Sequence, residues 1–286
     1  MLKISIYVVL ILHILSNLSS AKKVIVFGGS GRTGVQVVKS LLNENNFNKI
    51  VVPARNVGQA RRRLGPDTKR LQIIPCDIRS IKKVSTLEEY VENADCVINC
   101  IGYSPSTSSL LPSLPDPLGP KEIDCDACKR LIDACVHQNV KRFILISSLL
   151  TNGFAAGQLL NPQYLLLNSF GGILIWKREA EKYLESITHD NNNDNNNDNN
   201  NDNNMEWCII RPGGLTDTEL DDPVLYAERD TAFGGRISRK KVGEIVSAAA
   251  SADTAKNIIV EVAQTEDAVE IDPDVGFQNV RSYQYF

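Results

Sequence analysis

Short apolar runs alternate with amphipathic stretches along most of the chain. Continuous apolar runs are typical of strands in a parallel sheet that is covered on both faces, and amphipathic stretches are typical of the helices that cover it. This alternation predicts an α/β fold with a doubly wound parallel sheet. Strands are predicted at 24–27, 50–52, 71–74, 96–102, 142–146 and 207–210, and helices at 35–42, 59–64, 84–91, 124–138, 176–187 and 242–250.

Two segments interrupt this alternation. Residues 104–120 contain five prolines and several serines. They predict either a long loop at the carboxyl edge of the sheet, where ligands bind, or a surface excursion. Residues 190–204 form an Asn/Asp tract without an apolar residue. Such a tract has nothing to bury, so it predicts a disordered insertion within a single domain that covers 22–286.

The first 21 residues have the pattern of a targeting segment. Lys3 precedes a mostly apolar run at 4–15, and small residues lead up to Ala21. This pattern predicts a signal peptide that is cleaved after Ala21, with an uncleaved N-terminal anchor as the alternative. The apolar run is too short to cross a bilayer comfortably, so no transmembrane span is expected in the mature chain.

Composition limits the classes of partner and of cell compartment that fit this chain. The 286-residue chain has a net charge of −3, which offers no basic surface for nucleic acid. Its seven cysteines show no paired framework, which is typical of a reducing compartment and conflicts with a secretory leader. Cys125 and Cys128 have redox-type spacing but also fit two ordinary helix positions. The three histidines form no metal-binding pattern, so no metal is expected.

Three glycines, Gly28, Gly31 and Gly34, stand between the first predicted strand and the first predicted helix. A side chain at Gly28 or Gly31 would obstruct the turn or a bound phosphate, and one at Gly34 would push the helix off the strand. Arg32 and Thr33 complete the loop, which leads into a helix N-terminus suited to a pyrophosphate. The segment therefore predicts dinucleotide binding.

Arginine rather than a carboxylate follows the second predicted strand. An NAD site places an acidic residue about 20 positions beyond the glycines. Here Arg55 and Arg32 are predicted to bind a 2′-phosphate, which favours NADP(H) over NAD(H). The arginines at 61–63 fit an exposed helix face, with an added positive field as the alternative. Asp77 is predicted to accept from the adenine amino group or to cap the next helix. Gly102 closes the fourth strand, beside the expected nicotinamide ribose.

Four segments together resemble the atypical short-chain dehydrogenase/reductases, in the NAD(P)-binding (NmrA-like) branch that includes plant and algal NADP-binding proteins. The resemblance covers residues 22 to about 265 and rests on GGSGRTG (28–34), KRFILISS (141–148), WKREAEKYL (176–184) and IIRPGGL (209–215). It implies a Rossmann-type sheet with a small C-terminal substrate-side portion, and NADP(H) as the cofactor. It also adds the plastid to the candidate compartments.

Catalytic members of that family use Tyr-x-x-x-Lys together with a serine at the end of the fifth strand. By this resemblance Lys177 matches the lysine and Ser147 or Ser148 the serine, whereas Ile173 stands at the position of the tyrosine. An isoleucine cannot transfer a proton. The resemblance implies that Lys177 holds the nicotinamide ribose and that Pro212, in the fourth segment, lies at the nicotinamide end.

Two functions fit these residues. The first is an NADP(H)-dependent oxidoreductase that passes hydride to a small carbonyl, quinone or flavin-like acceptor without the usual tyrosine, with solvent supplying the proton. The spacing does not decide whether Tyr103 or Tyr164 faces the cleft. The second is a non-catalytic NADP(H)-sensing or scaffold protein. The partner is a small-molecule substrate or a protein. The compartment is the secretory route if the leader is cleaved, the plastid by resemblance, or otherwise the cytoplasm.

Overall fold

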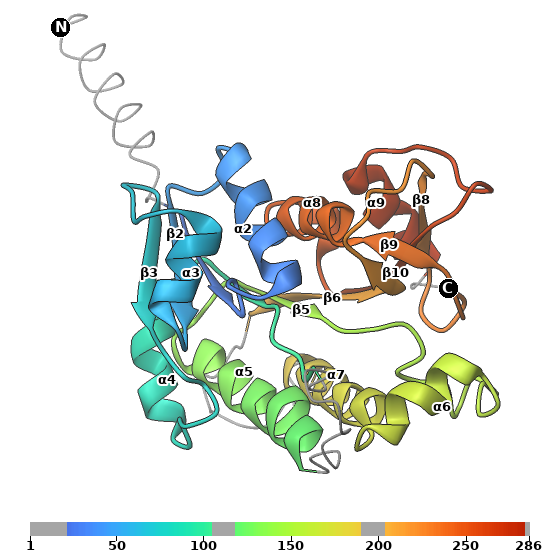
Figure 1. Cartoon of the computed structure of the whole chain (residues 1–286), viewed down its shortest axis with the longest axis horizontal. Helices are drawn as coiled ribbons and strands as arrows, with labels where there is room; N and C mark the ends of the chain where they lie inside the picture. Colours follow the sequence, from blue (N-terminus) through green and yellow to red (C-terminus); the bar gives the residue numbers. More distant parts are fainter. Residues whose placement is uncertain (1–21, 105–117, 190–203, 284–286) are drawn as a thin grey trace, which may run out of the picture.

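The computed structural model describes residues 22–104, 118–189 and 204–283, and seven parallel strands form its centre (Figure 1). Val24 on the first strand pairs with Ile50 on one side and with Cys96 on the other. The strand order reverses at this first strand, which is the arrangement of a Rossmann-type sheet and confirms the predicted fold class. In sheet order the parallel strands are β3 (Leu71–Pro75), β2 (Lys49–Ala54), β1 (Lys23–Phe27), β4 (Cys96–Asn99), β5 (Arg142–Ile146), β6 (Glu206–Pro212) and β10 (Ile258–Gln264).

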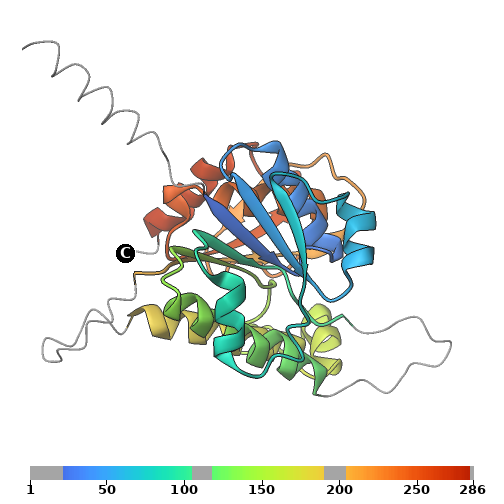
Figure 2. The ribbon, with the colours of Figure 1, turned by 90° about the vertical axis from the view of Figure 1, so that its left-hand side faces the viewer.

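Helices cover both faces of this sheet, as Figure 2 shows. A glycine allows close packing within one layer, because a Cβ at Gly243 would lie 2.7 Å from the backbone carbon of Gln36. One layer consists of α2 (Arg32–Asn43), α3 (Val57–Leu64), α8 (Arg239–Ala249) and α9 (Pro273–Tyr283). The other layer consists of α4 (Val84–Val91), α5 (Ala127–His137) and α7 (Ile173–His189).

Successive side chains of β1 face opposite layers, as the period of a strand requires. Val24 and Val26 pack toward α2 and α8, whereas Ile25 and Phe27 pack toward α4 and α5. All four side chains are buried. The continuous apolar runs of the sequence are therefore explained by two hydrophobic cores, one on each face of the sheet.

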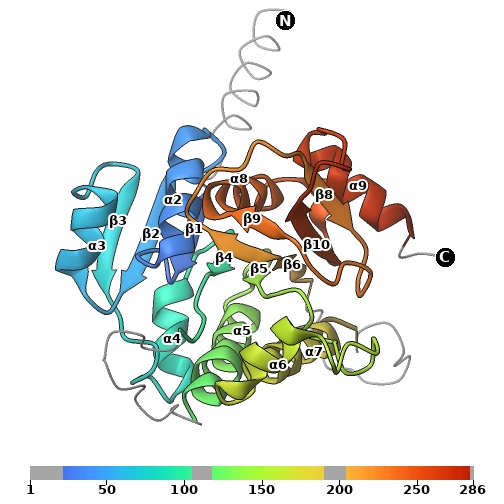
Figure 3. The ribbon, with the colours of Figure 1, turned by 45° about the vertical axis from the view of Figure 1, so that its right-hand side comes forward.

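Short strands that run antiparallel to β10 extend the sheet beyond it (Figure 3). β10 pairs with β8 (Val224–Ala227) and β9 (Arg236–Ser238), and β9 pairs in turn with β7 (Gly214–Thr216). A further helix, α6 (Pro162–Ser169), follows the long segment after β5 and packs on α7. β10, α6 and α9 lie outside the predicted elements; Glu261 interrupts the apolar run of β10.

Strand β4 and the helix after it differ from prediction. β4 ends at Asn99 rather than at Gly102, because the Asn99 side chain accepts a hydrogen bond from the Ile101 N–H at 3.0 Å. The helix predicted at 124–138 is confirmed as α5 from Ala127 to His137, but its first predicted residues belong to a π-helix, η1 (Lys121–Asp126), that leads into α5. A π-helical turn has no recognised sequence pattern, so the hydrophobic period alone could not predict it.

Four other helices begin two or three residues earlier than predicted, among them α7 and α8. α7 starts at Ile173, directly after a glycine pair, and α8 starts at Arg239. The Ser238 hydroxyl accepts a hydrogen bond from the Lys241 N–H at 3.1 Å. Ser238 is therefore the N-cap of α8, which satisfies one of the free N–H groups of its first turn.

Several predictions fall on residues that the structure does not describe. These are the leader at 1–21, most of the proline-rich loop (105–117) and nearly all of the Asn/Asp tract (190–203). Within the part of the chain that is described, none of the helices combines the length and apolar character that crossing a bilayer requires.

Candidate functional site

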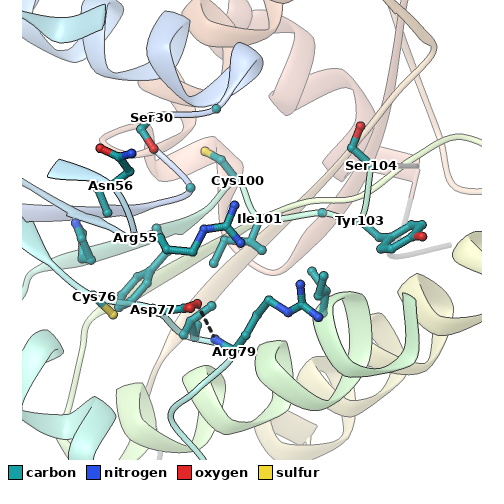
Figure 4. A pocket seen from close by; sticks show the side chains of 18 of the residues that line it. Ser30, Arg55, Asn56, Cys76, Asp77, Arg79, Cys100, Ile101, Tyr103 and Ser104 are labelled. Atoms are coloured by element: carbon teal, nitrogen blue, oxygen red, sulfur yellow. Dashed lines mark hydrogen bonds between the residues drawn. The ribbon is translucent and has the colours of Figure 1, made fainter. Parts of the chain in front are cut away.

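A pocket of about 380 Å³ lies at the carboxyl ends of β1, β2, β3 and β4. Its position at the reversal of strand order is where open parallel sheets bind their ligands. Figure 4 shows Arg55 and Arg79 extending into it, with Tyr103 on its far side. Further lining residues, grouped by segment, are Gly28, Ser30 and Gly31; Asn56 and Gln59; Cys76, Asp77 and Ile78; and Cys100, Ile101 and Gly102.

The glycine turn forms one wall of this pocket. Gly28 has φ +75°, and a Cβ there would lie 2.8 Å from the backbone carbon of Cys100. A Cβ at Gly34 would lie 2.2 Å from the Gly28 oxygen, so the third glycine is needed for the turn to close. Gly31 is the N-cap of α2. The turn thus places the N-terminus of α2 at the pocket, and its binding of a phosphate stays a prediction.

Arg55 directly follows β2 and is exposed on the pocket side. The next residue, Asn56, begins α3, and its side chain accepts a hydrogen bond from the Gln59 N–H at 2.8 Å. Among the described residues that line the pocket, Asp77 is the single carboxylate. Arg55 therefore lines the same pocket as Gly28, Ser30 and Gly31 of the glycine turn.

Arg32 lies elsewhere. Its guanidinium pairs with Asp217, which is also paired with Arg239 at 2.8 Å. The hydrogen bond from Arg32 is the main reason that the pKa of Asp217 falls below its ordinary value. Arg32 is absent from the pocket lining, so the structure does not bring it together with Arg55. Instead Arg63, from the arginine run on α3, donates to the Ser30 carbonyl of the glycine loop at 2.8 Å.

Asp77 lies in the pocket wall, after β3. Its carboxylate accepts from the Arg79 N–H at 3.2 Å, and its carbonyl accepts from the Ser80 N–H at 3.0 Å. This is a local turn rather than the cap of the next helix, because α4 begins only at Val84. The predicted capping role is therefore wrong, whereas the adenine role stays a prediction.

Lys177 and Ser147 line a second, narrow space. Lys177 Nζ lies 2.9 Å from Asp124 Oδ1, and all three residues line one narrow space between α7 and the ends of β4 and β5. Ser147 is buried, whereas Ser148 is half-buried. Ile173 is also buried, one turn before Lys177 on α7.

Arg211, in the IIRPGGL segment, does not line the pocket. Its side chain is fully buried and pairs with Glu181 on α7, with Glu261 on β10 and with Asp230. Burial opposes the charged form of Glu181, but Arg211 still holds the pKa of that carboxyl below its ordinary value. Arg211 therefore belongs to a buried cluster. Pro212 ends β6 next to it, and its carbonyl accepts from the Leu149 N–H at 3.0 Å.

Tyr103 and Tyr164 differ in whether they face the pocket. Tyr103 lines the pocket. Tyr164 is buried on α6 against Leu149, Leu150 and Leu174, so it does not face the cleft.

Cys125 and Cys128 occupy buried positions three residues apart, at the junction of η1 and α5. Neither forms a disulfide, and all seven cysteines of the chain are free thiols. Burial raises the pKa of Cys128 to about 12, and its sulfur accepts a hydrogen bond from the Asn99 amide at 3.3 Å. A thiol that resists ionisation is a poor nucleophile, so these residues act as small packing groups.

Comparison with other proteins agrees with this geometry. The chain is 32% identical over 253 residues to an uncharacterized chloroplastic protein of Arabidopsis thaliana, At2g34460, in a match that covers 88% of this chain and 80% of that protein. It is 30% identical over 252 residues to the chloroplastic protein TIC 62 of the same plant, which covers 81% of this chain and 34% of TIC 62. The chain thus spans about a third of TIC 62.

Solved structures share the fold. The oxidoreductase ylbE of Lactococcus lactis superposes with a TM-score of 0.66 at 18% identity, covering 91% of this chain and 97% of that one. A short-chain dehydrogenase/reductase of Veillonella parvula in complex with NADP superposes with a TM-score of 0.57 at 17% identity, covering 85% and 94%. The sequence matches the family described as NAD(P)H-binding over residues 28–253. Since this match spans the glycine turn and most of the parallel sheet, the chain belongs to the NAD(P)H-binding family.

Proposed function

We propose that this protein is an NADP(H)-dependent oxidoreductase that reduces a small carbonyl, quinone or flavin-like acceptor without a catalytic tyrosine. The observation that carries the proposal is the position of Arg55, which lines the pocket beside the glycine turn where an NAD-selective site has a carboxylate. Family membership supplies the class of nucleotide, and this arginine supplies the preference for its phosphorylated form.

The preference follows from charge and geometry. A 2′-phosphate carries a double negative charge and three acceptor oxygens, which match the planar array of donors on a guanidinium. Arg55 provides that group, and Arg63, which donates to the Ser30 carbonyl, adds positive charge at the glycine loop. A carboxylate able to bind two free ribose hydroxyls is absent from this part of the described pocket wall. The NADP complex of the Veillonella parvula neighbour is consistent with this choice.

The acceptor would bind at the nicotinamide end. When bound, NADPH supplies a hydride to the acceptor. Lys177 holds the ribose, and the half-buried Ser148 offers a hydroxyl to the acceptor oxygen. Ser147 is buried and lines the narrow space beside Lys177. Water supplies the balancing proton, because the buried Ile173 has none to give.

A non-catalytic role is the second candidate. Ile173 favours it, because the position that carries the proton donor in catalytic relatives is apolar and 5% exposed. In that case the protein binds NADP(H) to sense its redox state or to present a surface to a protein partner, without turnover.

The experiment that separates these functions is an oxidation assay with the full chain. NADPH is followed at its absorbance band while quinones, flavins and aldehydes are added in turn, with Lys177→Met as the control variant. Consumption of NADPH with at least one acceptor, slowed in the variant, supports the oxidoreductase. Binding of NADPH without consumption supports the sensing role. Failure to bind NADPH contradicts both.

We also propose the plastid as the compartment, because relatives at 30% identity or more are named chloroplastic. Fractionation of the source cells followed by N-terminal sequencing tests this. We expect a processed chain in the plastid fraction. A chain that begins at Met1 contradicts removal of the leader, and recovery from another fraction contradicts the compartment.

A further inference from the structure

An ion pair joins α7 to the π-helix η1 under the predicted nicotinamide end. The Lys177 ammonium lies 2.9 Å from Asp124 Oδ1; the Asp124 side chain is fully buried and that of Lys177 is 14% exposed. The Tyr103 N–H donates to the same carboxylate, at 3.3 Å from Oδ1 and 3.2 Å from Oδ2. One buried carboxylate therefore holds both the ammonium and the segment that follows β4.

The backbone of η1 carries this carboxylate inward. The Ala127 N–H donates to the Glu122 carbonyl, five residues earlier, as in a π-turn. π-helices account for well under 1% of residues; they occur mostly as single turns within α-helices and are frequent at functional sites. Asp124 lies within this turn and is buried, whereas Asp126 on the same turn pairs with Lys121 and is 38% exposed. The two aspartates thus differ in burial and in what they hold.

Gly102 leaves the ion pair open on one side. A Cβ at this position would lie 3.3 Å from Lys177 Nζ and 3.4 Å from Asp124 Oδ1. Its φ is outside the left-handed region, so the backbone itself does not require glycine here. Gly102 is exposed and lines the pocket. A ligand that lies over Gly102 therefore meets the ammonium of Lys177 without an intervening side chain.

Nothing on the preceding turn of α7 can orient that ammonium. Ile173 is apolar and buried, so it offers Lys177 no hydrogen bond. A lysine side chain is flexible and strongly hydrated, and it gains a fixed direction only from its partners. Asp124 is the partner that the structure supplies.

We propose that Asp124 is the positioning residue for Lys177: it fixes the ammonium beside Gly102, where the ribose of the nicotinamide half of NADP(H) would bind. The proposal rests on the proposed function, because it takes NADP(H) as the ligand. It assigns Asp124 no contact with the cofactor. Its effect is on the half of the cofactor that reaches Lys177, and the adenosine half in the pocket beside Arg55 is untouched.

The test compares NADPH with 2′,5′-ADP, which contains the adenosine half alone. Calorimetric titrations use the full chain and its variants Asp124→Asn, Lys177→Met and the double variant, with Asp126→Asn as the matched control. Asparagine keeps the size of Asp124 and can still accept from the Tyr103 N–H. We expect Asp124→Asn to weaken NADPH by about tenfold or more, as for a lost charge-assisted hydrogen bond. Affinity for 2′,5′-ADP stays within twofold, and Asp126→Asn changes neither.

The double variant tests whether Asp124 affects NADPH affinity through Lys177. If Asp124 acts through Lys177, Asp124→Asn has almost no further effect on NADPH affinity once Lys177 is methionine. Equal weakening of NADPH and 2′,5′-ADP, or an undiminished effect in the Lys177→Met background, overturns the proposal. A wild-type chain that binds neither ligand contradicts the proposed function instead.

A second variant covers the case in which Asp124→Asn does not fold. Gly102→Ala adds one methyl group against the ion pair from the pocket side and leaves both charges in place. We expect it to weaken NADPH and to spare 2′,5′-ADP. Unchanged NADPH affinity in Gly102→Ala contradicts the placement of the ribose over the Lys177–Asp124 pair.

Discussion

Arg211 and Glu181 are joined by two hydrogen bonds, Nε to Oε1 at 3.0 Å and Nη2 to Oε2 at 2.8 Å, with both side chains fully buried. The same guanidinium pairs with Asp230 at 2.7 Å and with Glu261 at 3.0 Å. One arginine thereby compensates carboxylates from α7, from β10 and from the segment after β8. This cluster fixes α7, the helix that carries Lys177, to the sheet.

Replacing Arg211 by methionine removes the cation that these three carboxylates share and leaves Glu181 with Arg178 as its cation, at 3.1 Å. Removing one member of a buried ion pair costs about 3–5 kcal/mol, so we expect a loss of this size in the free energy of unfolding at pH 7. In the wild type the pKa values of Glu181 and Asp230 are lowered, so their stabilisation is present above the ordinary carboxyl pKa and is lost as the pH falls through the lowered values.

The variant has the opposite pH dependence. Without Arg211, burial raises the carboxyl pKa values, so protonation on acidification relieves the unpaired charge. Urea unfolding from pH 7 to pH 4 should therefore show the gap between wild type and Arg211→Met narrowing. The exposed pair of Arg61 with Asp67 provides the control, and Arg61→Met should change little at either pH. A gap that stays constant or widens toward pH 4 contradicts the assignment of the cluster.

Gly34→Ala should disrupt the glycine turn. The added Cβ would lie 2.2 Å from the Gly28 oxygen, so either the turn or α2 must move. We expect a loss of about 1–3 kcal/mol in stability together with loss of NADPH binding. Gly58→Ala on α3, where the nearest atom would lie 3.5 Å away, is the matched control and should be neutral or slightly stabilising. Thermal unfolding and NADPH titration measure both effects; normal NADPH binding by Gly34→Ala would count against the phosphate role of the turn.

Arg55→Ala should weaken NADPH far more than NADH. Loss of charge-assisted hydrogen bonds to a 2′-phosphate predicts a rise of about tenfold or more in the dissociation constant for NADPH. NADH lacks that phosphate, so its dissociation constant should change by less than about threefold. Fluorescence titrations of both nucleotides, with Arg61→Ala as the surface control, make the measurement. Equal weakening of the two nucleotides would refute the role of Arg55.

Ile173→Tyr should not restore a conventional catalytic centre. Ile173 is 5% exposed at the start of α7, so a phenol there must be forced into packed surroundings. We expect a loss of about 1–3 kcal/mol in stability and no gain in NADPH oxidation. The control is Ile175→Tyr, two residues on, where the native side chain is 48% exposed and tyrosine should be tolerated. A large gain in turnover by Ile173→Tyr would show that the tyrosine position faces the acceptor after all.

Features that depend on a local sequence pattern could be predicted from the sequence. The apolar run at 142–146 predicts a buried parallel strand because both faces of β5 are covered. The glycine turn could also be predicted, because the backbone at Gly28 and at Gly34 comes into close contact within one short segment. Arg55 lines the pocket because it directly follows a strand whose end is predictable, whereas its binding of a 2′-phosphate stays a prediction.

Contacts between distant segments could not be predicted in the same way. Arg32 stands inside the glycine loop, yet it pairs with Asp217, which reaches it only through the fold of the C-terminal portion. Arg211 lies in a motif that suggests the nicotinamide end, and its three carboxylate partners, two buried and one half-buried, come from separate segments. Asp124 is buried because it lies in a π-turn, and the hydrophobic period of the sequence does not predict a π-turn. In each case the missing information is which charges the tertiary fold brings together.

The central claim is that the pocket beside the glycine turn selects NADP(H). Titration of the full chain with NADPH and with NADH, in one buffer and at one salt concentration, tests it most directly. The position of Arg55 predicts that NADPH binds at least about tenfold more tightly than NADH, and that raising the salt concentration narrows the difference. Equal or tighter binding of NADH, or binding of neither nucleotide, would contradict the claim.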